Sequence, residues 1–172
     1  MAASGSGQVS VAGHSAASAR VEIKAFREGA VIPKKATEGS AGYDLCACIP
    51  EYTSGMMIHG SSSLIVPTGL NVNIPEGYEI QIRPRSGLAA KHGITVLNTP
   101  GTIDSDYSGD GENFELKVIL FNHNKMPFNV NHGDRIAQMV VAKLAPHELV
   151  EVEEFGQTEN KSRKGGLGST GK

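Results

Sequence analysis

Apolar and polar residues alternate in short runs along most of the chain. Val21, Ile23 and Ala25 are separated by charged residues, and Ile80 and Ile82 alternate with polar ones. A period of two residues is typical of strands that bury one face against a core. Turns rich in glycine and proline separate these runs, so each strand is short. Strands are predicted at residues 20–25, 42–48, 64–82 (as several short strands), 94–98, 114–122, 136–144 and 150–155.

Residues 86–91 give the one helical signal, and they are enough for one or two turns. Strands this short and this regularly spaced indicate an all-β domain. A sandwich, a jelly roll and a closed barrel all fit the pattern. Met56 and Met57 lie in a turn-rich stretch and are predicted to fill the core.

The two ends of the chain differ from the central domain, residues 20–155. Residues 1–19 are mainly Ser, Ala and Gly, with no acidic residue and without the arginines of an organelle transit peptide. A disordered leader is predicted there, because the small apolar surface cannot offset the entropy that is lost on ordering the chain. Residues 156–172 are polar and glycine-rich, and they predict a flexible C-terminal segment.

The charge balance narrows the classes of partner. A net charge of −2 and a pI near 6.3 give no broad basic surface for nucleic acid, so a few placed residues must hold any phosphate. No apolar run reaches membrane-spanning length, and no secretory signal is visible. A cytoplasmic location is expected, with an organelle or the nucleus also open. Cys46 and Cys48 are two residues apart on one predicted strand, so both are expected to be reduced.

Candidate chemistry begins where the predicted strand 78–83 ends at Pro84. Arg85, Ser86 and Gly87 follow at the start of the predicted helix. A helix N-terminus, a hydroxyl and a guanidinium together can hold a phosphate. A capped turn with a solvated arginine fits these residues equally well.

A second candidate follows the strand predicted at 94–98. Pro100 and Gly101 suit the two central positions of a type II turn, so a hairpin is predicted. Its return arm would place Asp104 and Asp106 on one face and Tyr107 on the other. A carboxylate near a phosphate can orient or deprotonate a water. Ordinary turn chemistry would also explain two aspartates here.

Other segments are ambiguous when taken alone. Asp44 starts a strand, and Asp134 and Arg135 precede another that carries Gln138. The glycine-rich end lacks the strand and the helix that flank a P-loop, which excludes Walker-type nucleotide binding. The six histidines are scattered, and no Ser/His/Asp or metal-ligand spacing is visible in the sequence.

Taken together and in order, five segments resemble the five motifs of the trimeric deoxyuridine triphosphatase (dUTPase) family. Each motif alone is weak, but five in this order with suitable spacing are specific. They are AGYDL (41–45), RPRSGLA (83–89), NTPGTIDSDYSG (98–109), GDRIAQ (133–138) and GGLGSTG (165–171).

The resemblance implies a Mg²⁺-using hydrolase that converts dUTP and water to dUMP and pyrophosphate. Such an enzyme limits uracil in DNA and supplies dUMP for thymidylate synthesis. The family fold is a jelly-roll-like β subunit, and three copies form a homotrimer that shares its active sites between subunits. Neither nucleic acid nor a membrane is an expected partner.

The resemblance also assigns roles to individual residues. Asp104 would activate the water that attacks the α-phosphorus, and Tyr107 would pack under the deoxyribose. Asn98 and the backbone at Thr102 and Ile103 would bind the uracil edge. The remaining substrate-binding positions would be Arg85, Ser86, Gly87, Lys117, Gln138, Arg163, Leu167 and Gly168, with Asp44, Asp134 and Arg135 in supporting roles. Mg²⁺ would be held by triphosphate oxygens and waters, with no direct protein ligand.

The sequence departs from the family pattern in three places. Leu167 stands where the family usually has a phenylalanine, and the loss of base stacking is worth about 0.5–1.5 kcal/mol. Arg163 lies one residue too close to the last motif. Residues 110–114 (DGENF) are an insertion after the third motif, either a longer surface loop or a regulatory element.

Two other functions fit part of the pattern. A dCTP deaminase, alone or with dUTPase activity, would need an additional glutamate near the base, and the predicted hairpin offers Asp104 but no such glutamate. A binding or signalling protein could keep the fold without turnover, but the presence of Asp104, Ser86 and Tyr107 disfavours it.

Overall fold

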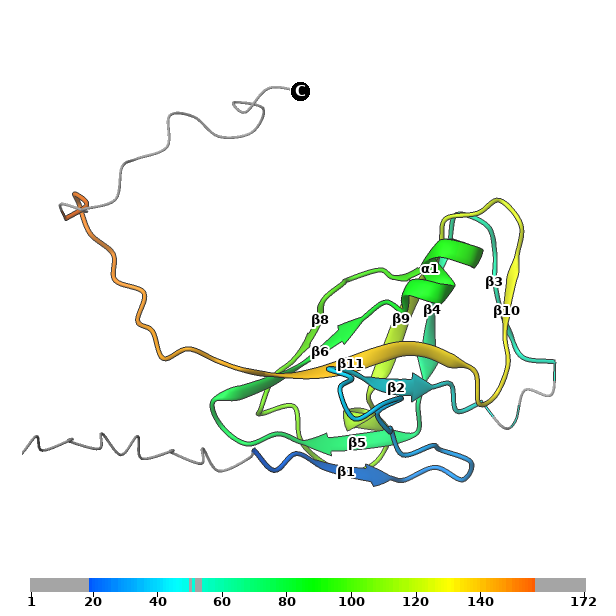
Figure 1. Ribbon diagram of the computed structural model, residues 1–172, viewed down its shortest axis with the longest axis horizontal. Coiled ribbons are helices and arrows are strands. Elements are labelled where there is room, and N and C mark those ends of the chain that lie inside the picture. The colour runs from blue at the N-terminus through cyan, green and yellow to red at the C-terminus, as the bar shows by residue number, and fades with distance from the viewer. Residues whose placement is uncertain (1–18, 50, 52–53, 157–172) are drawn as a thin grey trace, which may run out of the picture.

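The computed structural model describes residues 19–49, 51 and 54–156, and these form four small antiparallel sheets with one short α-helix. Figure 1 shows how the sheets are arranged, with β1 and β5 side by side along the lower edge. The largest sheet contains, in order, β2 (Tyr43–Cys46), β11 (Arg135–Lys143), β6 (Tyr78–Arg83) and β8 (Gly101–Ile103). A second sheet contains β4 (Ser63–Pro67), β9 (Lys117–Asn122) and β7 (Ile94–Val96). The other two sheets are pairs of strands, β1 (Glu22–Ala25) with β5 (Leu70–Asn73) and β10 (Phe128–Val130) with β3 (Met56–Ile58).

The predicted alternation of buried and exposed residues is present in the longer strands. In β9, Val118 and Leu120 are buried while Lys117 is exposed, and in β6 Ile80 and Ile82 are buried. Buried side chains from all four sheets join one continuous hydrophobic core. The prediction of a mostly β fold with one short helix is therefore confirmed.

The predicted helix is α1 (Ser86–His92), which ends at Gly93. Gly93 has a left-handed backbone with φ +58°, and its N–H caps the helix at the carbonyl of Ala89. A glycine in this conformation ends helices because it has no Cβ to clash. The helices in the described part of the chain are all too short or too polar to cross a lipid bilayer.

The hairpin predicted around Pro100 and Gly101 does not form. β7 pairs with β9 and β8 pairs with β6, so the connection at 97–100 crosses from one sheet to another. The Thr99–Pro100 bond is cis, and Gly101 pairs with Ile82 in β8 without a positive φ. The type II turn was therefore a wrong prediction, because such a turn needs a positive φ at its second central residue, which would be Gly101.

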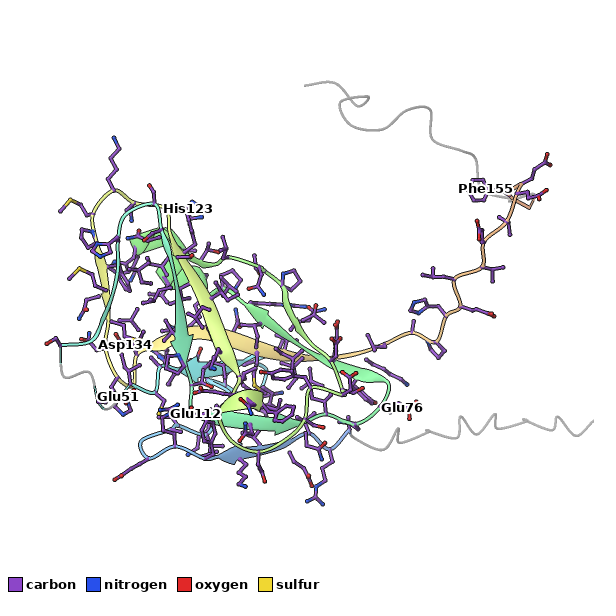
Figure 2. The ribbon with its side chains drawn as sticks, turned by 180° about the vertical axis from the view of Figure 1, so that it is seen from behind. Glu51, Glu76, Glu112, His123, Asp134 and Phe155 are labelled. Carbon is purple, nitrogen blue, oxygen red and sulfur yellow. The ribbon has the colours of Figure 1, made fainter. Side chains whose placement is uncertain are left out.

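The last predicted strand, 150–155, is also wrong. After β11 the residues 144–156 leave the sheet as an arm, coloured orange in Figure 1. Leu149 is 92% exposed and Phe155 is 94% exposed, and Figure 2 shows Phe155 far from the sheets. Alternating apolar residues form a strand only when they pair with the edge of a sheet, and in the described part of the chain the arm pairs with no strand.

Smaller differences concern strand boundaries and one side chain. The strand predicted from Phe114 begins at Lys117, because Glu112–Phe114 form a 3-10 helix, η1. Met57 was expected in the core but is 53% exposed, since it alternates with the buried Ile58 on β3. Apart from Ala19 and Gly156, the predicted leader and C-terminal segment lie outside the described residues.

Candidate active site

One part of the site begins where β8 ends. Thr102 and Ile103 pair with β6, and Asp104 follows directly with an exposed side chain. The N–H of Tyr107 donates to the carbonyl of Asp104 at 3.1 Å and closes a turn over Asp106. Asp106 therefore lies in a turn, and the prediction that it shares a strand face with Asp104 is wrong. The turn still brings Asp104 and Tyr107 to the same pocket.

This pocket has a volume of about 310 Å³, which is enough for part of a nucleotide. Its apolar side comes from Ile65 on β4 and Ile119 on β9, which are paired in register. Polar and apolar groups therefore face each other across it. The lining residues are Ile65, Thr102, Ile103, Asp104, Tyr107, Glu115, Lys117 and Ile119.

Tyr107 is held at both its hydroxyl and its ring. The hydroxyl donates to the carbonyl of Glu115 at 3.1 Å and lies 3.5 Å from that of Asn113. The ring meets Phe114 edge-on, with 6.0 Å between the centroids and 64° between the planes. A tyrosine at a pocket wall can thus present its ring to a ligand while its polar end is satisfied.

Glu115 is a buried carboxylate in the pocket wall, only 2% exposed. One oxygen accepts the N–H of Gly69 at 2.8 Å. The other oxygen lies 3.6 Å from a guanidinium nitrogen of Arg27 and 3.7 Å from Nζ of Lys117. The pairing anchors Lys117, whose ammonium also reaches the carbonyl of Glu112 at 3.4 Å. Paired and hydrogen-bonded in this way, a buried charge becomes tolerable.

The residues that sequence reasoning missed are Glu115, Arg27, Ile65 and Ile119. Ile65 and Ile119 come from strands that no site motif contains. Glu115 does leave one signal, since a charge directly precedes the apolar run that begins at Leu116. A charge at such a position is either solvent-facing or paired, and only the fold decides between these.

The second part of the site is a cluster of Asp44, Arg85 and Arg135. One Asp44 oxygen accepts Nε of Arg85 at 2.9 Å, and the other accepts Nη1 of Arg135 at 3.1 Å. Arg85 also donates to the carbonyl of Arg135 at 3.1 Å. Arg85 is therefore held in place and is not a freely solvated side chain. With two guanidinium groups to one carboxylate, the cluster keeps a net positive charge beside Ser86 and Gly87 at the start of α1.

Gln138 belongs to the same end of the sheet. It pairs with Asp44 on one side and with Arg83 on the other. Its side-chain amide donates to the carbonyl of Pro84 at 2.9 Å and so fixes the chain just before Arg85. Gly42 leaves room for it, because a Cβ there would lie 2.5 Å from the Gln138 side-chain oxygen.

Asp134 and Asn98 lie at the margins of these two clusters. The carboxylate of Asp134 accepts the N–H of Asn131 at 2.8 Å, which closes the turn before β11. Asn98 lies in the connection before β8, with its amide against Gly101. The predicted residues Arg163, Leu167 and Gly168 lie outside the described residues.

The two clusters do not meet within one chain. Asp104 follows Ile103, which pairs with Ile80 near the start of β6, whereas Arg85 lies beyond the end of β6. At about 3.3 Å per residue, the strand separates them by roughly 15–20 Å. The convergence of Arg85 and Asp104 expected within this short stretch is therefore wrong for a single chain.

The described part of the chain shows neither an activated thiol nor a cluster of side chains arranged for a metal. Cys46 and Cys48 are both free, as predicted. Burial raises the pKa of the Cys46 thiol, and the nearby Asp44 carboxylate raises it further. Burial likewise raises the pKa of Cys48, so neither thiol is a ready nucleophile at neutral pH. Residues 19–49, 51 and 54–156 hold no group of three or more His, Cys, Asp or Glu side chains arranged for a metal.

The fold and the two clusters define a β protein suited to nucleotides, with a nucleoside-sized pocket beside a carboxylate and a separate arginine site. A profile of the dUTPase family matches residues 28–171. The chain is 51% identical over 154 residues to the deoxyuridine 5'-triphosphate nucleotidohydrolase of Fusobacterium nucleatum, covering 89% of this chain and 99% of that one. It is 54% identical over 140 residues to that of Neorickettsia sennetsu, covering 81% and 87%. The chain belongs to the dUTPase family.

Solved structures agree on the fold. The dUTPase of Staphylococcus bacteriophage 80alpha with dUPNHPP has a TM-score of 0.74 at 24% identity, covering 88% of this chain and 98% of that one. The dUTPase from phage phi11 of S. aureus has a TM-score of 0.68 at 22% identity, covering 81% and 99%.

Proposed function

We propose that this chain hydrolyses dUTP to dUMP and pyrophosphate, with Asp104 as the catalytic carboxylate. The observation that carries the proposal is the placement of Asp104 and Tyr107 on one nucleoside-sized pocket. Membership of the dUTPase family and the names of the relatives support it. Such an activity would limit uracil in DNA and supply dUMP for thymidylate synthesis.

Asp104 accepts a proton from the attacking water in this mechanism. The water oxygen bonds to the α-phosphorus, and the bond from that phosphorus to the bridging oxygen breaks, which releases pyrophosphate. The exposed Asp104 side chain extends from a backbone that is fixed by β8 before it and by the turn to Tyr107 after it. A base held at a defined position contributes about 10²–10⁴-fold to a rate.

The uracil edge is read by backbone groups of β8. In the described part of the chain, β8 pairs only with β6 and so forms an edge of its sheet. An edge strand presents unpaired N–H and C=O groups in a fixed pattern. Thr102 and Ile103 would offer these groups to the base, with the Asn98 amide beside them. Cytosine would leave mispaired groups, at about 1–3 kcal/mol each when buried.

Tyr107 provides the floor for the sugar. Its hydroxyl is bound to the carbonyl of Glu115, so the ring face is the part left for the ligand. A deoxyribose that packs on this ring leaves no room for a 2′-hydroxyl. Lys117, on the same pocket, adds a positive charge for the nucleotide.

We place the triphosphate on Arg85, Ser86 and Gly87. Asp44 and Arg135 would orient the Arg85 side chain, and Gln138 would support the backbone just before it. Since this cluster and Asp104 are separated within a chain, a second copy must supply it. The arrangement we propose is a homotrimer of jelly-roll-like subunits with shared active sites. The exposed apolar residues of the arm, such as Leu149 and Phe155, support contacts between subunits.

Mg²⁺ would be held by the triphosphate oxygens of dUTP and by waters, with no direct protein ligand. Bound there, it would neutralise charge on the phosphate oxygens. The protein then has to balance the remaining negative charge, and two arginines around one carboxylate meet that need. The C-terminal residues Arg163, Leu167 and Gly168 would close over the nucleotide.

Glu115 lies on the pocket, and a glutamate near the base is what a dCTP deaminase would need. Its two oxygens are already engaged by the N–H of Gly69 and by the cations Arg27 and Lys117. A carboxylate bound in this way is a structural group and not a free acid or base. Ammonia release from dCTP would reveal deamination, and we expect none.

The decisive experiment measures pyrophosphate release from dUTP, dCTP and dTTP by the wild-type chain and by Asp104→Asn. We expect turnover of dUTP only, and a fall in kcat of about 10²–10⁴-fold in the variant. Asn keeps the size of the side chain, so a loss reports the carboxylate itself. Absence of dUTP turnover would contradict the proposed reaction, and full activity of Asp104→Asn would contradict the assigned base.

A further inference from the structure

The insertion at residues 110–114 lies directly behind Tyr107. Phe114 meets the Tyr107 ring edge-on, and the carbonyls of Asn113 and Glu115 face its hydroxyl. The hydrogen bonds of the hydroxyl and the aromatic contact of the ring therefore come from the insertion or from the residue after it. A surface loop without a role would not need to hold a pocket residue.

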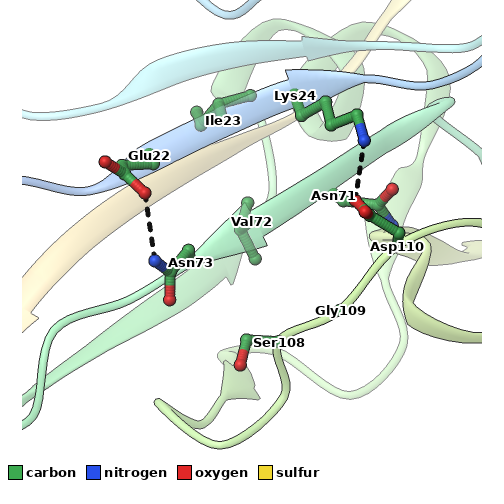
Figure 3. Close-up of a pocket in the computed structure, with 9 residues that line it drawn as sticks. All are labelled: Glu22, Ile23, Lys24, Asn71, Val72, Asn73, Ser108, Gly109 and Asp110. Atoms are coloured by element: carbon green, nitrogen blue, oxygen red, sulfur yellow. Dashed lines mark hydrogen bonds and ion pairs between the residues drawn. The ribbon is translucent and has the colours of Figure 1, made fainter.

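The insertion is itself anchored to the β1–β5 pair. The buried Asn71 of β5 exchanges two hydrogen bonds with Gly111, its amide donating at 3.0 Å and its oxygen accepting at 3.1 Å. Figure 3 shows Lys24 of β1 reaching Asp110 across the groove between β5 and the insertion, and this ion pair measures 2.9 Å. The buried double hydrogen bond is the stronger anchor, because exposed ion pairs contribute little.

Gly109 permits the close packing of Phe114. A Cβ on Gly109 would collide with the Phe114 ring, so the ring lies against bare backbone. The insertion is thus packed on one side by Gly109 and Tyr107 and tied on the other side to Asn71. Through these contacts the insertion connects β5 to the pocket residue Tyr107.

We propose that residues 110–114 are a positioning segment, and that Phe114 sets the discrimination between dUTP and UTP by fixing the Tyr107 ring. This inference rests on the proposed role of Tyr107 under the deoxyribose. A fixed ring cannot move away to admit a 2′-hydroxyl. Without Phe114 the ring is held only at its hydroxyl, so it can tilt away from the sugar and a ribose then fits. Phe114 touches no substrate and acts only through Tyr107.

The test compares kcat and KM for dUTP and UTP in Phe114→Ala, Phe114→Tyr and the wild type. We expect Phe114→Ala to lower the ratio of kcat/KM for dUTP over UTP by about three- to tenfold, the range that one aromatic pair supports. KM for dUTP should rise while kcat changes little, because Asp104 is untouched. Phe114→Tyr keeps the ring and should retain the ratio.

Met126→Ala is the matched control, since it also removes an exposed apolar side chain from a loop. It should leave the ratio at the wild-type value. If Phe114→Ala is not obtained folded, Phe114→Leu removes the aromatic ring while losing less volume, and it gives the same test.

An unchanged ratio in Phe114→Ala, with normal discrimination by the wild type, would overturn the positioning role. This includes the case in which kcat/KM falls by the same factor for dUTP and UTP, because such a loss indicates general destabilisation. Absence of dUTP turnover in the wild type would instead contradict the proposed function, and the inference with it.

Discussion

At the residue scale, Asp44 gives the arginine cluster its shape. Two guanidinium groups repel each other, and here one carboxylate binds both, at 2.9 and 3.1 Å. Such charge-assisted bonds also fix direction, so Arg85 and Arg135 are oriented before any phosphate arrives. A preorganised site avoids the entropy cost of ordering two long side chains on binding.

The two cysteines allow a test of burial at this scale. Because burial raises the pKa of both thiols, each has less thiolate at pH 7.5 than an ordinary cysteine, and the thiolate is the reactive form. We expect folded protein to react with iodoacetamide more slowly than protein in guanidinium, with the rate rising as the pH is raised. Mass spectrometry resolves the sites, and Cys46→Ser and Cys48→Ser assign them. Equal rates in folded and unfolded protein would refute the expectation.

Single residues were predictable from sequence where a local motif marks them. Arg85 and Asp104 each lie in such a motif, and their order along the chain supplied the family resemblance. Glu115 was not predictable, because two of its three partners are distant in the sequence: Gly69 is 46 residues away and Arg27 belongs to the segment after β1. Only the folded chain brings a donor and two cations to one carboxylate.

At the element scale, periodicity located the strands better than it located their partners. The stretch 94–103 does contain two strands, but each pairs in a different sheet. A Pro-Gly sequence indicates a change of direction, and the alternating pattern cannot say which sheet receives the next strand. The arm shows the same limit, since residues 150–155 alternate without a partner edge.

Truncation after Gly156 tests the role of the C-terminal segment. The core of the described chain is formed within residues 19–156, so the shortened protein should keep its melting temperature and its association state. Its turnover of dUTP should fall by about tenfold or more, because closure over the substrate excludes water and completes the site. Calorimetry, sedimentation and pyrophosphate release measure these three properties. Loss of folding would refute the assignment of this segment as a lid.

Leu167→Phe is the complementary change in the full-length chain. A phenylalanine at this position can stack on the base, which is worth about 0.5–1.5 kcal/mol. We therefore expect KM for dUTP to fall by about two- to tenfold with little change in kcat. An unchanged KM would indicate that residue 167 does not cover the base.

At the scale of the whole molecule, the two parts of the proposed site lie apart in a single chain. The pocket with Asp104 and the cluster with Arg85 lie toward opposite ends of β6, roughly 15–20 Å apart. An arm with strongly exposed Leu149 and Phe155 extends from the same sheet. The neighbouring Val150 and Val152 are exposed as well, and a run of exposed apolar side chains is typical of a contact with another chain. Both features are explained together if neighbouring copies complete one another.

Mixing two inactive variants tests this sharing directly. Asp104→Asn lacks the base, and Arg85→Ala lacks the phosphate cluster, so each alone should be almost inactive. Each variant keeps the residue that the other lacks. In a trimer that contains both variants, a site is therefore complete where an Arg85→Ala subunit supplies Asp104 and the neighbouring Asp104→Asn subunit supplies Arg85. With closed symmetry and random assembly of equal amounts, about a quarter of the sites satisfy this. We expect co-refolded mixtures to recover about a quarter of the wild-type rate, whereas mixing without refolding recovers none. A co-refolded mixture that stays inactive, while refolded wild type regains its rate, would place both residues in a site within one chain.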